Sequence, residues 1–194
     1  MSTWAIRQHP SPRPTWRMRR IVDLVRLVNG FPFPSEAFGH DGLVPLLRIR
    51  DVLSSDFQTF VSGPVPPGAM IRDDDIVIGM DGDFNLVTWT RGPAALNQRL
   101  CALRPREDVD MRFLAYYLPH VLSVINDLTF STTVKHLSSM DVLGERLLLP
   151  PLSEQRRIAD FLDTETGRVD SLRQLTESQL KSLDHRLLEP LPLS

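Results

Sequence analysis

The chain has 194 residues, with 22 Lys and Arg, 24 Asp and Glu and a formal net charge of −2, a length that supports one core with an appendage. No apolar run approaches the roughly 20 residues that span a bilayer, and a single cysteine, Cys101, leaves no intramolecular disulfide, so we expect a cytoplasmic protein in which Cys101 is buried. The charge counts against a protein held to nucleic acid by bulk electrostatics, although arginine, the better ligand for phosphate and guanine, supplies nearly all of the positive charge.

The N-terminal segment 1–16 is expected to be an extended arm. Prolines at positions 10, 12 and 14 prevent regular structure. Residues 1–20 contain no acid and several arginines, namely Arg7, Arg13, Arg17, Arg19 and Arg20. Three interpretations stay open: a disordered tail, a misassigned start codon, and a basic arm that touches phosphate.

Two elements are expected in the next stretch. Arg20–Asn29 has helical spacing of its apolar residues and stops before Gly30, which predicts a short helix. Val44–Val52 predicts a strand with Arg48 and Arg50 on one face, because strand side chains repeat every two residues. These arginines either face water or line a phosphate surface. Residues 53–69 are rich in Ser, Gly and Pro and predict a loop.

A hairpin follows. Ile76–Met80 and Phe84–Thr90 read as its strands, because Asp81-Gly82 between them tolerates the positive φ of a tight turn. We expect Asp73–Asp75, just before the hairpin, to be solvated.

The same turn resembles the start of a calcium loop, with oxygen ligands available from Asp81, Asp83 and Asn85. Leu86 stands where such a loop needs glycine, and Gly92 where it needs a bidentate glutamate. No metal site is therefore expected.

Leu96–Leu103 predicts another strand, which begins with Asn97, Gln98 and Arg99. The amides can pair with adenine and the guanidinium with guanine, but the same side chains are ordinary in turns and caps. Asp108 or Asp110 can cap a helix that runs to Ile125 and is interrupted or kinked near Pro119.

Residues 129–136 combine hydroxyl groups with a lysine and a histidine in an expected loop. Thr132, Thr133, Lys135 and His136 have the chemistry for phosphate and base contacts, and the alternative is a capped surface loop. His136 has no nearby nucleophile in the sequence and is not expected to act as a catalytic base.

The stretch from Leu147 to Asp163 joins two parts of the chain. Leu147–Leu149 suits a buried strand, which Pro150-Pro151 ends because proline cannot donate to a sheet ladder. Ser153 can then cap a helix whose first turn contains Glu154. One apolar stripe follows at spacings of three, four or seven, and such a stripe needs a partner; its members are Ile158, Phe161, Leu162, Val169, Leu172, Leu175, Leu180, Leu183 and Leu187.

This junction, PPLSEQRRIADFLD before a long amphipathic helix, resembles the join between target recognition domain and spacer helix in specificity subunits of type I restriction-modification systems. Looser matches upstream extend the resemblance to most of residues 27–189; they are Gly30–Phe33, Pro45–Ile49, Asp75–Ile78, Leu96–Arg99 and Thr133–Leu137.

The resemblance implies double-stranded DNA, a methylating subunit that uses S-adenosylmethionine and an ATP-driven restriction subunit as partners, with no cofactor on this chain. It also implies that the segment around Lys135 approaches DNA. Full specificity subunits have two recognition domains and two antiparallel spacer helices, whereas this sequence has one of each. A second copy, another half-subunit, or an inactive truncated fragment are all compatible with that difference.

No phosphate-binding loop, dinucleotide turn, zinc-protease helix or nucleophile elbow occurs in the sequence, so we expect a recognition module and no enzyme. The alternatives are a coiled-coil interaction or regulatory protein that binds no DNA, and a hydrolase with its carboxylates near Asp73–Asp83. We predict an α+β fold divided into an arm (1–16), a DNA target recognition domain (17–152), a spacer helix that forms a coiled coil (153–189) and a tail (190–194).

Overall fold

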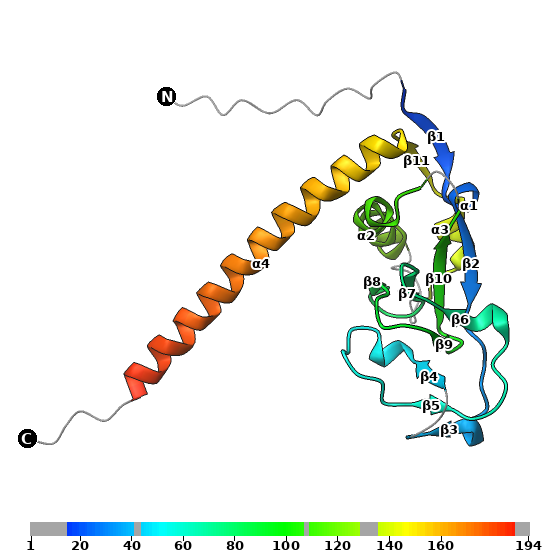
Figure 1. Cartoon of the computed structure of the whole chain (residues 1–194), viewed down its shortest axis with the longest axis horizontal. Coiled ribbons are helices and arrows are strands. Elements are labelled where there is room, and N and C mark those ends of the chain that lie inside the picture. Colours follow the sequence, from blue (N-terminus) through cyan, green and yellow to red (C-terminus); the bar gives the residue numbers. More distant parts are fainter. Residues whose placement is uncertain (1–14, 41–43, 107–108, 129–135, 189–194) are drawn as a thin grey trace, which may run out of the picture. The chain divides into compact units, whose positions relative to one another are not determined.

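The computed structural model describes residues 15–40, 44–106, 109–128 and 136–188, and places side chains as far as residue 182 (Figure 1). The chain divides into a unit that ends at Arg156 and a second unit, Arg157–Ser194. None of the helices that the structure describes combines the length and apolar character needed to cross a bilayer. The mixed α+β class predicted from the sequence is confirmed.

A four-stranded antiparallel sheet lies at the centre of the first unit, in the order β2 (Val25–Asn29), β10 (Leu100–Pro105), β7 (Ile76–Gly79) and β8 (Leu86–Thr88). Its inner strands are apolar over Ile76–Gly79 and over residues 100–103, because both of their faces are covered there. Ile76, Ile78 and Cys101 pack on one side with helix α2 (Met111–Leu128). The intervening residues, including Val77 and Ala102, pack on the other side in a second cluster.

That second cluster includes residues of a five-stranded sheet in the order β3 (Phe38–Gly39), β5 (Phe60–Val61), β4 (Val44–Leu47), β9 (Ala94–Leu96) and β6 (Met70–Ile71). Strands β4 and β9 are parallel, with Leu46 opposite Ala95 and Leu47 opposite Leu96. Burying side chains such as Leu47 and Leu96 stabilises the unit by about 1.5–3 kcal/mol each. The central sheet is therefore a middle layer between helix α2 and the second sheet.

A separate two-stranded ladder pairs β1 (Arg17–Arg20) with β11 (Arg146–Leu149). The short helices α1 (Ile21–Leu24) and α3 (Ser139–Gly144) bury apolar side chains in the same core as helix α2. Single turns of 3-10 helix complete the unit: η1 (Ser35–Ala37), η2 (Ile49–Asp51) and η3 (Pro67–Ala69).

Several local predictions are confirmed. The hairpin forms between β7 and β8, and Gly82 in its turn has φ of 74°. Helix α2 is capped by Asp110, whose Oδ1 accepts from the backbone N–H groups of Arg112 and Phe113 at 3.0 and 3.2 Å. The helix continues through Pro119 to Leu128, without the interruption that was one of the expectations there. Asp108, the other cap considered, lies outside the described residues.

Helix α4 (Leu152–Leu188) begins one residue before the predicted Ser153. The Pro151 carbonyl accepts from the N–H groups of Glu154 and Gln155 at 2.8 and 3.0 Å, so Ser153 lies inside the first turn. Trp16 Nε1 donates to the Glu154 carboxylate at 3.0 Å.

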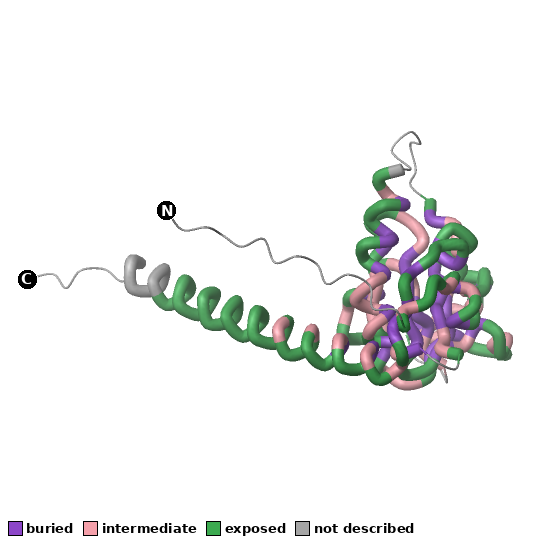
Figure 2. Tube along the Cα trace, turned by 90° about the horizontal axis from the view of Figure 1, so that it is seen from above, coloured by how far each residue is buried: buried purple, intermediate pink, exposed green. Residues whose placement is uncertain are grey.

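The predicted apolar stripe lies on helix α4, and most of the helix is exposed in Figure 2. Ile158 and Leu162 are half-buried, whereas its other described members are exposed: Phe161, Val169, Leu172, Leu175 and Leu180. The side chains of Leu183 and Leu187 lie outside the described part of the chain.

Several predictions of secondary structure are wrong. Arg20–Asn29 is a short helix only as far as Leu24, and its second half is strand β2, because β10 supplies the hydrogen-bonding partner. The strand predicted over Leu96–Leu103 is divided by a turn between β9 and β10. The loop predicted over 53–69 contains the short strand β5.

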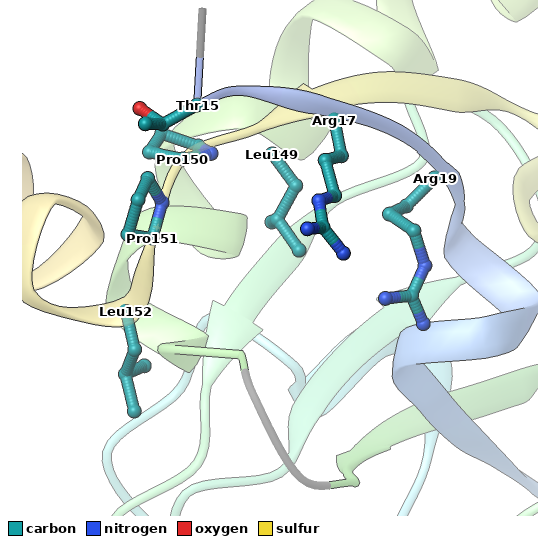
Figure 3. A pocket seen from close by; sticks show the side chains of 7 residues that line it. All are labelled: Thr15, Arg17, Arg19, Leu149, Pro150, Pro151 and Leu152. Carbon is teal, nitrogen blue, oxygen red and sulfur yellow. The ribbon is translucent and has the colours of Figure 1, made fainter.

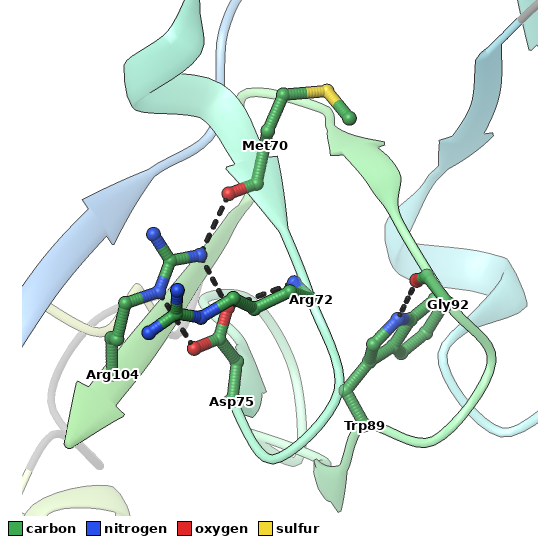
Figure 4. A network of polar contacts seen from close by, with 6 residues as sticks. All are labelled: Met70, Arg72, Asp75, Trp89, Gly92 and Arg104. Carbon is green, nitrogen blue, oxygen red and sulfur yellow. Dashed lines mark hydrogen bonds and ion pairs between the residues drawn. The ribbon is translucent and has the colours of Figure 1, made fainter.

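The acidic run at 73–75 also differs from the expectation of a solvated segment. The Asp75 side chain is 0% exposed and forms an ion pair with Arg104 (Figure 4). Its Oδ2 also accepts from the Arg72 backbone N–H at 3.0 Å, while Arg104 donates to the Met70 carbonyl at 2.9 Å. Because Arg104 belongs to β10 and Met70 to β6, this network joins the two sheets.

Candidate nucleic-acid interface

The turn between β9 and β10 presents the polar triplet Asn97, Gln98 and Arg99, which we call the readout turn. Leu100 N–H donates to the Asn97 carbonyl at 3.0 Å, and Gln98 N–H donates to Asn97 Oδ1 at 2.6 Å. Gln98 and Arg99 are exposed and Asn97 is half-buried. A fixed backbone with long polar side chains suits contacts to base edges.

The readout turn is held from two sides by backbone hydrogen bonds. Asn97 N–H donates to the Leu47 carbonyl at 3.0 Å, which continues the parallel pairing of β4 with β9. Gly30 N–H donates to the Leu100 carbonyl and Phe31 N–H to the Leu96 carbonyl, each at 2.9 Å.

Gly30 is required by this close approach. A Cβ at this position would lie 1.9 Å from the carbonyl oxygen of Asn97 and 2.8 Å from that of Leu100. Both contacts are with backbone, which cannot move without shifting the turn. Gly30 was predicted to end a helix, but in the structure it packs directly against the backbone of the readout turn.

Asp81 connects the readout turn to His136. One carboxylate oxygen of Asp81 accepts from Arg99 Nη1, and the other lies 2.8 Å from His136 Nδ1. Backbone hydrogen bonds also tie Met80, the residue before Asp81, to both segments. Met80 N–H donates to the Arg99 carbonyl at 3.0 Å, and Leu137 N–H donates to the Met80 carbonyl at 2.7 Å. Arg99 and His136 remain 60% and 62% exposed.

The electrostatics of this cluster favour the charged forms of Asp81 and Arg99. Burial acts to raise the pKa of Asp81, but hydrogen bonds from His136 and Arg99 outweigh it and leave the pKa below its ordinary value. The hydrogen bond to Asp81 raises the pKa of Arg99. An exposed cation is therefore held at the surface by an anion beneath it.

Arg48 and Arg50 do not share a strand face, which corrects the sequence prediction. Strand β4 ends at Leu47, and Arg50 lies in η2. The guanidinium of Arg48 lies 5.3 Å from the centre of the Phe38 ring, a distance typical of a cation–π contact. Arg50 Nε is 3.6 Å from Asp51 Oδ1. Arg48 directly follows Leu47, whose carbonyl accepts from Asn97 N–H, so we include Arg48 in the candidate site. Arg50 lies in η2 and does not continue strand β4.

The structure thus joins the readout turn to His136 through Asp81, and Arg48 follows Leu47, whose carbonyl accepts from Asn97 N–H. Thr132, Thr133 and Lys135 lie outside the described residues. Sequence reasoning missed the role of Asp81, which it considered only as a calcium ligand, because its partners lie 18 and 55 residues away. In the part of the chain that the structure describes, no three His, Cys, Asp or Glu side chains are grouped to hold a metal ion.

Comparison with known proteins identifies sequences and structures that are similar to this chain. Residues 14–181 match the family model described as the type I restriction modification DNA specificity domain. The chain is 45% identical over 166 residues to the specificity subunit of the type I restriction enzyme EcoBI from Escherichia coli. It is 25% identical over 176 residues to the EcoKI specificity subunit from Escherichia coli strain K12.

These relatives are longer than this chain. The matched regions cover 84% and 81% of the chain but only 35% and 38% of EcoBI and EcoKI specificity subunits, so the chain spans little more than a third of their length. The fold is similar to that of the HsdS subunit from Thermoanaerobacter tengcongensis, with a TM-score of 0.71 at 24% identity, over 93% of this chain and 46% of that one. A chain from a type I restriction-modification assembly gives a TM-score of 0.76, also at 24% identity, and 47% of it is covered.

Proposed function

This chain belongs to the family of type I restriction-modification DNA specificity domains, and we propose that its globular unit reads one part of a bipartite DNA site. It acts as a recognition subunit, and the chemistry belongs to its partners. A methylating subunit carries S-adenosylmethionine, and a restriction subunit cuts DNA. We place the recognition domain at residues 17–152 and the spacer helix at 153–189.

The readout turn is the observation that carries this proposal. Asn97, Gln98 and Arg99 stand on backbone that is hydrogen-bonded to β4, Gly30 and Met80, and rigid support of this kind favours specific contacts. The amides pair with adenine and the guanidinium with guanine in the major groove, while phosphate contacts set the register. Arg48 and His136 flank the turn and suit phosphate.

The other predicted contacts extend the proposed interface to phosphate. Arg50 reaches phosphate independently of Arg48, because the two do not extend from one strand. Thr132, Thr133 and Lys135 precede His136 in the sequence and contact DNA beside it.

Helix α4 supplies the second half of the proposal. Its exposed apolar residues, including Val169 and Leu172, pair with a second spacer helix from another copy or another half-subunit. Thirty-seven helical residues span roughly 55 Å at about 1.5 Å per residue. Such a rod exceeds one turn of DNA, about 34–36 Å, and sets the distance between two half-sites. A symmetric dimer reads a palindrome interrupted by a gap.

The test is methylation of DNA by an assembled complex. The chain is co-expressed with a type I methylating subunit, the complex is purified, and methylated positions are mapped across a plasmid library. We expect one bipartite motif. In the complex, Gln98→Ala and Arg99→Ala should each relax one position of that motif and weaken binding by about tenfold.

Arg72→Ala is the matched control, because it removes an exposed arginine outside the readout turn and should leave the motif unchanged. A complex that methylates one motif equally well with both readout variants would remove the turn from the site. Failure of every tested methylating subunit to bind the chain would favour the alternative of an interaction protein without a DNA target.

A further inference from the structure

The β1–β11 ladder, residues 17–20 and 146–149, presents a second cationic surface far from the readout turn. Strand β1 leads through α1 into the Val25 end of β2, whereas the readout turn is hydrogen-bonded at Gly30, beyond the other end of that strand. Five strand residues separate the two places by roughly 17 Å at about 3.3 Å per residue. The readout turn therefore does not account for the cationic surface of the ladder.

One face of the ladder borders a hollow of about 530 Å³ (Figure 3). Arg17 and Arg19 point into it from the same side of β1, opposite Leu149 and Leu147. Among the residues that the structure describes, neither arginine has an ion-pair partner. The remaining wall is largely apolar and consists of Thr15, Leu149, Pro150, Pro151 and Leu152.

The opposite face repeats this chemistry. Met18 and Leu148 are paired across the ladder and are 56% and 39% exposed. Arg20 lies directly opposite Arg146, and like charges at such positions destabilise a ladder. The only acid that offsets them among the described ion pairs is Asp23, 3.5 Å from Arg20. Arg20 and Arg146 therefore add little to the stability of the fold, which favours a role in binding.

We propose that the β1–β11 ladder is a docking surface for an acidic polypeptide segment with apolar side chains, carried by a protein partner. Its carboxylates meet Arg17 and Arg19, and an apolar side chain enters the hollow beside Leu149 and Pro151. A nucleic-acid backbone offers phosphates but few apolar groups, so it would leave the apolar wall and the Met18–Leu148 pair uncovered. The positive charge of the ladder together with its apolar surface therefore favours a protein segment over nucleic acid as the occupant.

The identity of the partner rests on the proposed function, under which it is the methylating subunit. The wild-type chain is titrated with that subunit, and the dissociation constant is compared with that of Arg17→Glu/Arg19→Glu. We expect the charge reversal to weaken the complex at least about tenfold. Arg17→Lys/Arg19→Lys, which keeps the charge, should stay within about threefold of wild type, because Lys can still meet a carboxylate as a point charge.

Arg26→Glu is the matched control, since Arg26 is an exposed arginine of the same unit outside the ladder. Thermal unfolding of each variant checks that the fold is kept. A complex that forms with wild type and is equally tight with the charge reversal overturns the docking surface alone. A charge reversal that weakens DNA binding and leaves the protein complex intact overturns it in favour of phosphate contact. No complex with wild type overturns both the docking surface and the proposed function.

Discussion

Asp75 and Arg104 form a two-pronged ion pair inside the globular unit. Arg104 Nε donates to Asp75 Oδ1 at 2.9 Å, and Nη2 donates to Oδ2 at 2.6 Å. The Asp75 side chain is fully buried and that of Arg104 is 17% exposed. The hydrogen bond and the negative charge of Asp75 raise the pKa of Arg104, so its guanidinium stays charged at every physiological pH.

Replacing one partner of this pair should be costly. Arg104→Met leaves a buried carboxylate without its counter-charge, and we expect the free energy of unfolding to fall by about 3–5 kcal/mol. Asp75→Leu/Arg104→Met should recover part of that loss, because no buried charge remains. Urea unfolding of the wild type, the single variant and the double variant measures these free energies. Arg26→Met, at an exposed position directly opposite Arg104, is the control, and an equal loss in the control would contradict the argument.

Gly30→Ala should damage the readout turn. The new Cβ would overlap the Asn97 carbonyl at 1.9 Å, so either the turn moves or the strand ends separate. We expect a loss of roughly 3 kcal/mol or more in the free energy of unfolding, accompanied by weaker DNA binding. Chemical denaturation and a DNA titration measure the two effects. Gly68→Ala, where a Cβ has nothing within 4 Å, should change neither.

Asp81 should make the stability of the unit depend on acid pH. Because its pKa is lower in the folded protein than in the unfolded chain, about 3.9, its stabilising contribution is present above about pH 4 and is lost as the pH falls through the folded pKa. Asp81→Asn should therefore unfold at a lower temperature than wild type at neutral pH. The difference should shrink as the pH is lowered from about 4 through the folded pKa.

Calorimetric melting curves across that pH range provide the measurement. Asp83→Asn is a suitable control, because Asp83 is an exposed carboxylate of the same turn. A gap between wild type and Asp81→Asn that showed no dependence on pH in the acid range would mean that ionisation of Asp81 is not its source.

The exposed apolar stripe of helix α4 should drive association. Val169→Glu/Leu172→Glu places charge at two positions that are 62% and 64% exposed, and a paired helix cannot bury these charges cheaply. Sedimentation equilibrium should show self-association of the chain weakened more than about tenfold, a change of about 1.4 kcal/mol. Gln174→Glu adds charge on another side of the helix and should have little effect. A chain that stays monomeric at high concentration would overturn pairing between copies.

The sequence predicted those elements whose signals are local. Pro150 and Pro151 end strand β11 where expected, and Asp110 caps helix α2. Val25–Asn29 is different, because its apolar spacing fits a helix as well as a strand, and the ladder with β10 decides between them. Likewise, β4 stops at Leu47 because the Arg48 carbonyl accepts from the Asp51 N–H at 2.9 Å, which begins a 3-10 turn.

The candidate site was predicted in its chemistry but not in its assembly. The polar triplet at 97–99 was singled out as a set of side chains for base edges, yet it was assigned to a strand. Its connection to Asp81 and Gly30 depends on how β7, β9 and β10 are arranged, and no local pattern encodes that arrangement. For the same reason the burial of Asp75 could not be foreseen without knowing that Arg104 lies beside it.

Cys101 gives the molecule an internal reporter. It lies 1% exposed on β10, the strand that holds both neighbours in the central sheet, and burial raises the pKa of its thiol to about 12. The thiolate is the form that attacks alkylating reagents, so labelling of the native chain must wait for this strand to open. The rate of modification at a single sulfur atom would then time the opening of the central sheet, with no engineered residue.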